Sequence, residues 1–257
     1  FPPGREIVDL MSESKLVLIL GGTSDIGFAT AKHYAAKSWS VCLAARDMAT
    51  TQRNAKDIAA RTGAEVLVRE LNILDATSFD RFIASLPRLP DTVVCVIGLL
   101  GNRRMAEVDL EHATTIIRTN YEGPALLLLR FAEAFGHRRS GTIVGVSSVA
   151  GDRGRASNYI YGSAKAGLTA FLSGLRNRLA STGVHVVTVK PGYVRTRMTE
   201  HLALSALLTA SPEAVATRIY EAAEIKKQDV IYVLRIWRLI IALISVIPER
   251  VFKNLRL

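Results

Sequence analysis

The chain has 257 residues, of which 49% are hydrophobic and 22% are charged, and its 33 Lys and Arg against 23 Asp and Glu give a net charge of +10. This length and composition predict one globular α/β domain of ordinary size and exclude a disordered, collagen-like or disulfide-stapled chain. Both cysteines lie inside apolar runs and the five histidines lack metal-ligand spacing, so we expect a reducing compartment and no metal site.

Six short apolar segments predict strands buried on both faces, namely residues 16–20, 41–45, 66–68, 93–97, 142–146 and 184–189. Amphipathic patterns between them predict helices over residues 26–37, 50–61, 76–86, 110–137 and 161–181. This alternation predicts a single doubly wound Rossmann domain: a parallel sheet with helices on both faces and ligands at the carboxyl ends of the strands. A helix over about 212–227 and a short strand within 229–234 bring the sheet to about seven strands.

The last part of the chain is both basic and apolar. Residues 225–257 hold seven basic and two acidic side chains, and on a helix Arg235, Arg238, Ala242 and Ser245 form one polar stripe in an otherwise apolar segment. The apolar run is shorter than the ~20 residues that cross a bilayer, so a helix lying in a membrane surface is predicted. A dimer interface and packing on the core are the alternatives. Trp237 and Phe252 are the only aromatic residues in the sequence from 235 to 257, which argues against nucleic acid.

We expect three parts in this chain. Residues 1–10 are interpreted as an N-terminal extension, because Met11 followed by Ser12 resembles a natural start. These ten residues lack the pattern of a signal peptide. Residues 11–234 form the predicted domain, and residues 235–257 form the tail that binds an anionic membrane surface.

A glycine-rich turn joins the first strand to the first helix, with the sequence Gly21-Gly-Thr-Ser-Asp-Ile-Gly27. Such a turn lets the backbone approach a pyrophosphate at the helix N-terminus. Asp25 could cap that helix, but it also places a carboxylate near the pyrophosphate. Arg46 ends the second strand, where an acidic residue would bind the ribose of NAD and an arginine can pair with the 2′-phosphate of NADP. NADP(H) is therefore favoured as the cofactor, with NAD(H) as the alternative.

The strongest chemical signal is Tyr161-Gly-Ser-Ala-Lys165, which places a phenol and an ammonium on one helical face. A nearby cation lowers a tyrosine pKa from ~10, so Tyr161 is predicted to be a general acid. Ser148 follows the fifth strand, at the edge of the sheet where the substrate is expected. Tyr159 is a competing candidate, but it lacks a lysine four residues on.

Together these motifs resemble the short-chain dehydrogenase/reductase family over about residues 15–234. The resemblance implies that Tyr161 is the acid/base, that Ser148 orients the substrate carbonyl, and that Asn120 supports a water-linked proton path. It implies that Lys165 lowers the Tyr161 pKa and holds the nicotinamide ribose. The cofactor contacts that it implies are Gly21, Thr23, Ser24, Asp25, Ile26, Gly27, Arg46, Asn72, Gly98, Pro191, Gly192, Val194 and Thr196.

The chain departs from the family pattern in three places. Leu20 and Asp25 replace a threonine and a glycine of the first turn, Cys95-Val-Ile-Gly98 replaces Asn-Asn-Ala-Gly, and Asn72 stands where an aspartate is common. Five segments are similar to one branch of the family, the decaprenylphosphoryl-2-keto-erythro-pentose reductases. They are Gly21-Gly-Thr-Ser-Asp-Ile-Gly27, Ile97-Gly-Leu-Leu-Gly101, Tyr161-Gly-Ser-Ala-Lys-Ala-Gly-Leu168, Val194-Arg-Thr-Arg-Met198 and the closing Ile247-Pro-Glu-Arg-Val-Phe-Lys253. That branch completes the 2′-epimerisation of decaprenylphosphoryl ribose to the arabinose form.

The branch resemblance implies a polyprenyl-phosphate-linked keto sugar as substrate and a flavin oxidase as the partner that makes the ketone. It implies a role in cell-envelope polysaccharide synthesis, in the cytoplasm and peripheral on the cytoplasmic membrane. We also expect a homodimer or homotetramer. Two alternatives are a soluble reductase of acyl, steroid or small-ketone substrates and a non-catalytic dinucleotide sensor.

Four arginines are expected to rim the cleft and bind the substrate phosphodiester, because arginine forms bidentate hydrogen bonds with such anions. They are Arg153, Arg155, Arg195 and Arg197. The alternative is that they are solvated loop charges.

Overall fold

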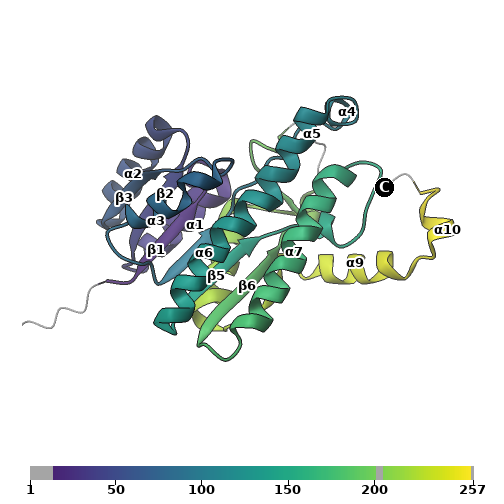
Figure 1. The fold of residues 1–257 in the computed structure, drawn as a ribbon. Helices are drawn as coiled ribbons and strands as arrows, with labels where there is room; N and C mark the ends of the chain where they lie inside the picture. The colour runs from purple at the N-terminus through teal and green to yellow at the C-terminus, as the bar shows by residue number, and fades with distance from the viewer. Residues whose placement is uncertain (1–13, 201–204, 256–257) are drawn as a thin grey trace, which may run out of the picture.

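The computed structural model describes residues 14–200 and 205–255, so the expected N-terminal extension lies outside the described residues (Figure 1). Its centre is a seven-stranded, wholly parallel sheet in the order β3-β2-β1-β4-β5-β6-β9. The strands are β1 (Leu16–Leu20), β2 (Ser40–Ala45), β3 (Val66–Glu70), β4 (Thr92–Cys95), β5 (Gly141–Val146), β6 (Val184–Lys190) and β9 (Val230–Tyr232). The predicted doubly wound sheet is confirmed, including its seventh strand.

Helices cover both faces of the sheet because successive strand side chains point to opposite sides. Val17 and Ile19 of β1 pack in the core with α1 (Asp25–Ala35), α2 (Met48–Thr62) and α8 (Pro212–Tyr220). Leu16, Leu18 and Leu20 pack on the other face, with α3 (Phe79–Ala84), α6 (Gly123–Arg138) and α7 (Tyr159–Leu179). Only β3 departs from the prediction of full burial: it is half-buried because it is an edge strand with a neighbour on one side.

The strand order reverses between β1 and β4, which opens a crevice at the carboxyl ends of the strands. Elements that the hydrophobic periodicity of the sequence did not predict lie beside this crevice. The helix predicted over 110–137 is α5 (Leu110–Ile117) and α6, joined by a π-helical turn at Arg118–Glu122. The short strands β7 (Tyr193–Val194) and β8 (Thr209–Ala210) form a second sheet, and strands of two residues leave no pattern in a sequence.

The tail forms α9 (Ile236–Val246) and α10 (Glu249–Phe252), which extend from β9 away from the sheet (Figure 1). Trp237 packs inward, where its Nε1 donates to the carbonyl of Leu208 at 3.1 Å. A Cβ on Gly192 would lie 1.9 Å from that Nε1, so Gly192 makes room for the indole. Trp237, which belongs to the helix predicted to lie in a membrane surface, is therefore not available to a membrane, because the domain already buries it.

Arg153 anchors the far end of the tail. Its guanidinium donates to the carbonyl oxygens of Ile244 and Ile247 and pairs with Glu249 at 3.0 Å. It also lies 3.8 Å from the centre of the Phe252 ring. The last carbonyl groups of a helix have no N–H partner within the helix, and the Arg153 guanidinium donates hydrogen bonds to such carbonyls at the end of α9. The expectation that Arg153 binds substrate phosphate is corrected, because these contacts occupy its guanidinium.

No helix among the described residues is long and apolar enough to cross a bilayer.

Candidate active site

The glycine-rich turn between β1 and α1 has the geometry that a dinucleotide pyrophosphate requires. Gly21 adopts a φ of +97°, a conformation that side chains disfavour, and a Cβ on Gly27 would lie 2.3 Å from the carbonyl oxygen of Gly21. Ser24 is the N-cap of α1, since its Oγ accepts from the Gly27 N–H at 3.0 Å. The amides of Asp25 and Ile26 begin the helix, where N–H groups lack intrahelical partners and favour an anion. These residues fit the cofactor.

Asp25 does not cap the helix, because Ser24 already does. Its carboxylate instead accepts from the backbone N–H of Arg197 at 2.8 Å and from the Arg197 Nε at 3.0 Å. The same guanidinium donates to the carbonyl of Thr23 at 2.5 Å. Arg197, predicted to bind substrate, is thus bound to the glycine-rich turn.

Arg46 and Asn72 lie where the adenosine half of a dinucleotide would bind. Arg46 is exposed immediately after β2, and no ion pair is formed by it among the described contacts. Asn72 is exposed just after β3, and its Oδ1 accepts from the Leu74 N–H at 3.1 Å.

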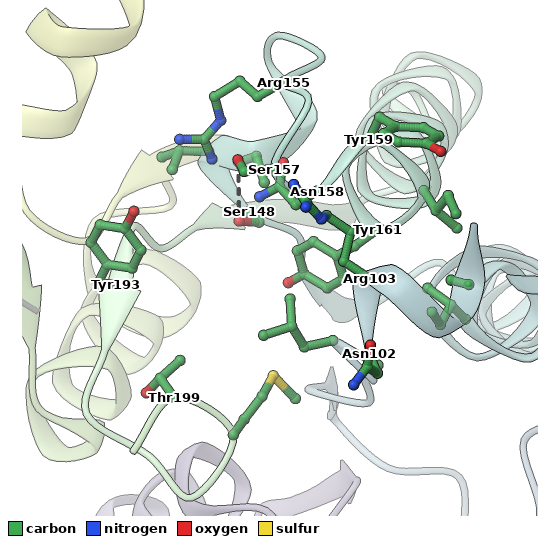
Figure 2. Close-up of a pocket in the computed structure, with 18 of the residues that line it drawn as sticks. Asn102, Arg103, Ser148, Arg155, Ser157, Asn158, Tyr159, Tyr161, Tyr193 and Thr199 are labelled. Carbon is green, nitrogen blue, oxygen red and sulfur yellow. Dashed lines mark hydrogen bonds between the residues drawn. The ribbon is translucent and has the colours of Figure 1, made fainter. Parts of the chain in front are cut away.

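Tyr161 and Ser148 meet at the carboxyl edge of the sheet. Ser148 follows β5 and caps a 3₁₀ turn at Val149–Gly151, with its Oγ accepting from the Ala150 N–H at 3.1 Å. Burial raises the pKa of Tyr161 to about 12, and a hydrogen bond with Ser148 acts in the opposite direction. Figure 2 shows the Tyr161 hydroxyl directed into the same cavity as Ser148, with Tyr159 farther out. The pair that the sequence predicted is therefore assembled.

Lys165 lies one turn along α7 and is 3% exposed. Its Nζ donates to the carbonyl of Val146 at 3.0 Å and lies 5.8 Å from the centre of the Tyr161 ring. Burial lowers the pKa of Lys165 to about 8. The expectation that Lys165 brings the Tyr161 pKa below its ordinary value is corrected here, because burial is the dominant influence on both groups. A raised pKa favours the neutral phenol, which is the form that donates a proton.

Asn120 lies in the π-helical turn and is fully buried. Its Oδ1 accepts from the Leu99 N–H at 3.2 Å, and its Nδ2 donates to the carbonyls of Leu99 at 2.6 Å and Ile116 at 2.8 Å. A Cβ on Gly98 would lie 3.0 Å from the Asn120 Oδ1 and 3.4 Å from the Lys165 Nζ. Asn120 thus positions the loop that replaces Asn-Asn-Ala-Gly, and Gly98 leaves space beside Lys165.

The segment after β6 borders the crevice at the carboxyl ends of the strands. The carbonyl of Pro191 accepts from the Val149 N–H at 3.0 Å, which ties this segment to the turn that carries Ser148. Thr199 Oγ1 donates to the carbonyl of Val194 at 2.5 Å and accepts from the Thr196 N–H at 3.2 Å. These hydrogen bonds place Pro191, Gly192, Val194 and Thr196 in one segment beside the Ser148 turn, and their contact with the cofactor stays a prediction.

A cavity of about 680 Å³ adjoins Ser148 and Tyr161 (Figure 2). Its apolar wall consists of Leu100, Ile116, Ile160, Met198 and Trp237. Its charged residues are Arg103, Arg104 and Arg155, and no Asp or Glu lines it among the residues that the structure describes. Of the four arginines predicted to rim the cleft, only Arg155 lines this cavity, and Arg195 is exposed outside it.

Sequence reasoning missed Arg103 and Arg104, which lie in the single turn α4 (Arg103–Ala106). Arg103 lies 3.6 Å from Glu107, whereas the described ion pairs include none for Arg104 or Arg155. Arg103 and Arg104 are adjacent and come shortly after the segment Gly98-Leu-Leu-Gly101, so this basic pair was a sequence signal for an anion site there. Among the described residues, no three His, Cys, Asp or Glu side chains converge as a metal site would require.

Comparisons with known proteins agree with this geometry. A family model of the short chain dehydrogenases matches residues 15–205. An uncharacterized oxidoreductase of Mycobacterium tuberculosis is 40% identical over 203 residues, which are 78% of this chain and 81% of that protein. An NADP-dependent 3-hydroxy acid dehydrogenase of Schizosaccharomyces pombe is 31% identical over 189 residues, 72% of this chain and 73% of that one. The solved structure of a short chain dehydrogenase/reductase family protein matches with a TM-score of 0.77 at 26% identity, covering 86% of this chain and 95% of that one.

Proposed function

Because the chain belongs to the short-chain dehydrogenase/reductase family and is an NAD(P)-dependent oxidoreductase, we propose that it reduces the keto group of a polyprenyl-phosphate-linked sugar. The observation that carries this proposal is the cavity beside Tyr161, which combines an apolar wall with polar side chains and whose charged lining, among the described residues, is arginine alone. A substrate with a phosphodiester, a sugar and a hydrocarbon chain matches such a lining.

NADPH is the preferred reductant in this proposal. Arg46 is exposed beyond β2 and has no partner among the described ion pairs, so it is available to a 2′-phosphate. The relative from Schizosaccharomyces pombe is named as NADP-dependent, which supports the same choice. NADH is the alternative.

In the proposed reaction, this chain supplies the proton and the cofactor supplies the hydride. NADPH, when bound, supplies the hydride that reduces the carbonyl carbon. The Ser148 hydroxyl orients the carbonyl oxygen, and Tyr161 donates its phenolic proton to that oxygen as it becomes an alkoxide. The buried Lys165 ammonium stabilises the tyrosinate that remains until solvent returns the proton through the path beside Asn120.

Asn158 supports a hydroxylated substrate. Its Oδ1 is buried and has no hydrogen-bond partner in the described structure, and the residue lies in the cavity wall. A buried acceptor without a partner is costly, and a sugar hydroxyl would donate to it.

Arg104 and Arg155 are expected to bind the substrate phosphate. The variants Arg104→Ala and Arg155→Ala should each raise KM for the phosphate-linked keto sugar about tenfold or more, since a charge-assisted hydrogen bond contributes ~1.5–3 kcal/mol. The matched control is Arg195→Ala, which removes an exposed arginine outside the cavity. NADPH oxidation would be followed with the lipid-phosphate sugar and with its dephosphorylated form. An equal rise in KM for both substrates would contradict phosphate binding.

The exposed face of the tail is proposed to bind an anionic membrane. Ile236, Leu239, Leu243 and Val246 are 43–76% exposed on α9, and Arg235, Arg238, Arg250 and Lys253 are exposed around them. Burying the apolar side chains contributes roughly 25 cal/mol per Å², and each basic side chain adds ~1 kcal/mol near anionic headgroups. Trp237 and Arg153 join this surface to the active-site domain, so the cavity would lie beside the lipid that carries its substrate.

Deletion of the tail is a poor test because it would also remove Trp237 from the cavity wall. The double variant Leu239→Glu/Leu243→Glu leaves that wall intact and should no longer sediment with phosphatidylglycerol vesicles at low salt, whereas the unmodified chain should. The control Val108→Glu/Ile225→Glu places the same charges at exposed apolar positions outside the tail and should still sediment. Equal sedimentation of the two double variants would exclude this surface.

Two further partners belong to the proposal. A flavin oxidase would supply the ketone for cell-envelope polysaccharide synthesis. A homodimer or homotetramer would cover the apolar side chains on the outer face of α5 and α6, where Ile117, Tyr121, Leu126 and Leu129 are 38–41% exposed.

A second candidate is the reduction of a small 3-oxo acid. The relative from Schizosaccharomyces pombe is named a 3-hydroxy acid dehydrogenase, and a carboxylate would also pair with Arg104 or Arg155. Such a substrate needs neither the apolar wall nor the tail surface. Turnover of small 3-oxo acids that exceeds turnover of the lipid-linked sugar would favour this candidate.

A further inference from the structure

Asp25 places a carboxylate in the first turn of α1, where a dinucleotide pyrophosphate is expected. An uncompensated negative charge there would oppose the cofactor. This chain departs from the family pattern at Asp25. Its binding of a dianionic pyrophosphate therefore depends on which group balances the charge of the Asp25 carboxylate.

Arg197 compensates the charge of Asp25 from 172 positions farther along the chain. Three hydrogen bonds join it to the glycine-rich turn: its backbone N–H and its Nε reach the two carboxylate oxygens at 2.8 and 3.0 Å, and its Nη2 reaches the Thr23 carbonyl at 2.5 Å. The backbone N–H and the guanidinium of one residue thus hold the two oxygens of one carboxylate, and the guanidinium hydrogen bond is charge-assisted. The pair therefore sets the distance between the two segments that carry its members.

Those two segments lie on different sides of the crevice. Asp25 follows β1, while Arg197 comes directly after Thr196, in the loop that follows β6 and β7. Thr199 holds that loop through the Val194 carbonyl and the Thr196 N–H. The pair thus connects the pyrophosphate side of the site to the nicotinamide side.

The exposure of the pair indicates that its main effect is on binding. The side chains of Arg197 and Asp25 are 65% and 29% exposed. Solvent-exposed ion pairs add little to folding stability and exchange partners readily. Variants at these positions should fold, so their effects on the cofactor can be measured directly.

We propose that Arg197 is a cofactor-positioning residue that cancels the charge of Asp25 and holds the loop of residues 195–199 against the pyrophosphate site. With the cofactor bound, the guanidinium would remain paired with the Asp25 carboxylate and would offset its negative charge toward the pyrophosphate. This inference rests on dinucleotide binding by the family and is independent of the sugar substrate proposed above.

The test is a double-substitution cycle read out by equilibrium binding. The dissociation constants for NADPH and NADH would be measured by titration for Arg197→Ala, Asp25→Asn and the combined variant. Arg197→Ala should weaken both cofactors about tenfold at low salt, because it leaves the Asp25 carboxylate facing the phosphates. Asp25→Asn should bind as tightly as the unmodified chain or up to about threefold more tightly, and the combined variant should recover to within about threefold of it.

Three controls separate this role from a structural one. Added salt should reduce the Arg197→Ala defect, because screening weakens the repulsion, and should have less effect on the combined variant. Binding of 2′-AMP, which lacks the pyrophosphate, should be unchanged by Arg197→Ala. Arg46→Ala should show the opposite pattern, weakening NADPH and 2′-AMP but not NADH.

Two results would overturn the inference. One is Arg197→Ala binding both cofactors within about twofold of the unmodified chain. The other is a combined variant as weak as Arg197→Ala, which would mean that Asp25 does not oppose the cofactor. Neither result would affect the proposed substrate, because the lipid-linked sugar is tested through Arg104 and Arg155.

Discussion

Replacing Tyr161 with phenylalanine is expected to lower the rate of ketone reduction by ~10²–10⁴, the usual loss when a general acid is removed. The variant keeps the ring that fills the cavity wall and loses only the hydroxyl, which is directed into the cavity beside Ser148 (Figure 2). Cofactor affinity and unfolding midpoint should therefore stay close to those of the unmodified chain. The measurement is NADPH oxidation under single-turnover conditions, with NADPH binding measured in parallel.

Tyr159→Phe is the matched control, because it removes the same atom from the same helix at a side chain that is 46% exposed. It should retain nearly full activity. If Tyr161→Phe kept more than about a tenth of the rate, Tyr161 would not be the acid. An unmodified chain that binds NADPH but reduces no keto sugar, oxo acid or other ketone would instead favour the dinucleotide-sensor alternative.

Lys165→Met is expected to abolish turnover while making the folded chain more stable at neutral pH. Burial lowers the pKa of Lys165 from its ordinary 10.5 to about 8, so the folded state disfavours the charged form. That difference corresponds to a penalty of about 3 kcal/mol at pH values below 8. Methionine removes the charge but also the hydrogen bond to Val146, which costs about 1 kcal/mol. A net gain of about 2 kcal/mol in the free energy of unfolding is expected at pH 7.

The sign of the pH dependence gives a sharper test of Lys165. Between pH 8 and 10.5 the unfolded chain binds more protons at this position than the folded chain, so the stability of the unmodified protein rises relative to Lys165→Met. The advantage of the variant should shrink across that interval and disappear above it. Urea unfolding at several pH values measures this difference. Lys56→Met, at an exposed position, should show no such trend, and a constant advantage for Lys165→Met would contradict the buried ammonium.

The amino-acid sequence by itself determined the features that depend on neighbouring residues. The apolar run 16–20 coincides with β1, and the strands and helices alternate as predicted, because backbone periodicity is a local property. Tyr161 and Lys165 lie on one face of a helix because four residues make about one turn. Ser148 follows a strand, and the carboxyl ends of the strands face the crevice. The family and most of the candidate catalytic residues followed from these local patterns.

Tertiary structure alone decided which charged side chains meet. Arg153, Arg155, Arg195 and Arg197 look alike in the sequence, yet only Arg155 lines the cavity, while Arg153 anchors the tail and Arg197 binds Asp25. A long flexible side chain has many partners within reach, and packing between distant segments selects one of them. Burial has the same origin: the environment that raises the pKa of Tyr161 and lowers that of Lys165 is built by strands and loops far apart in the chain, so no spacing of residues could reveal it.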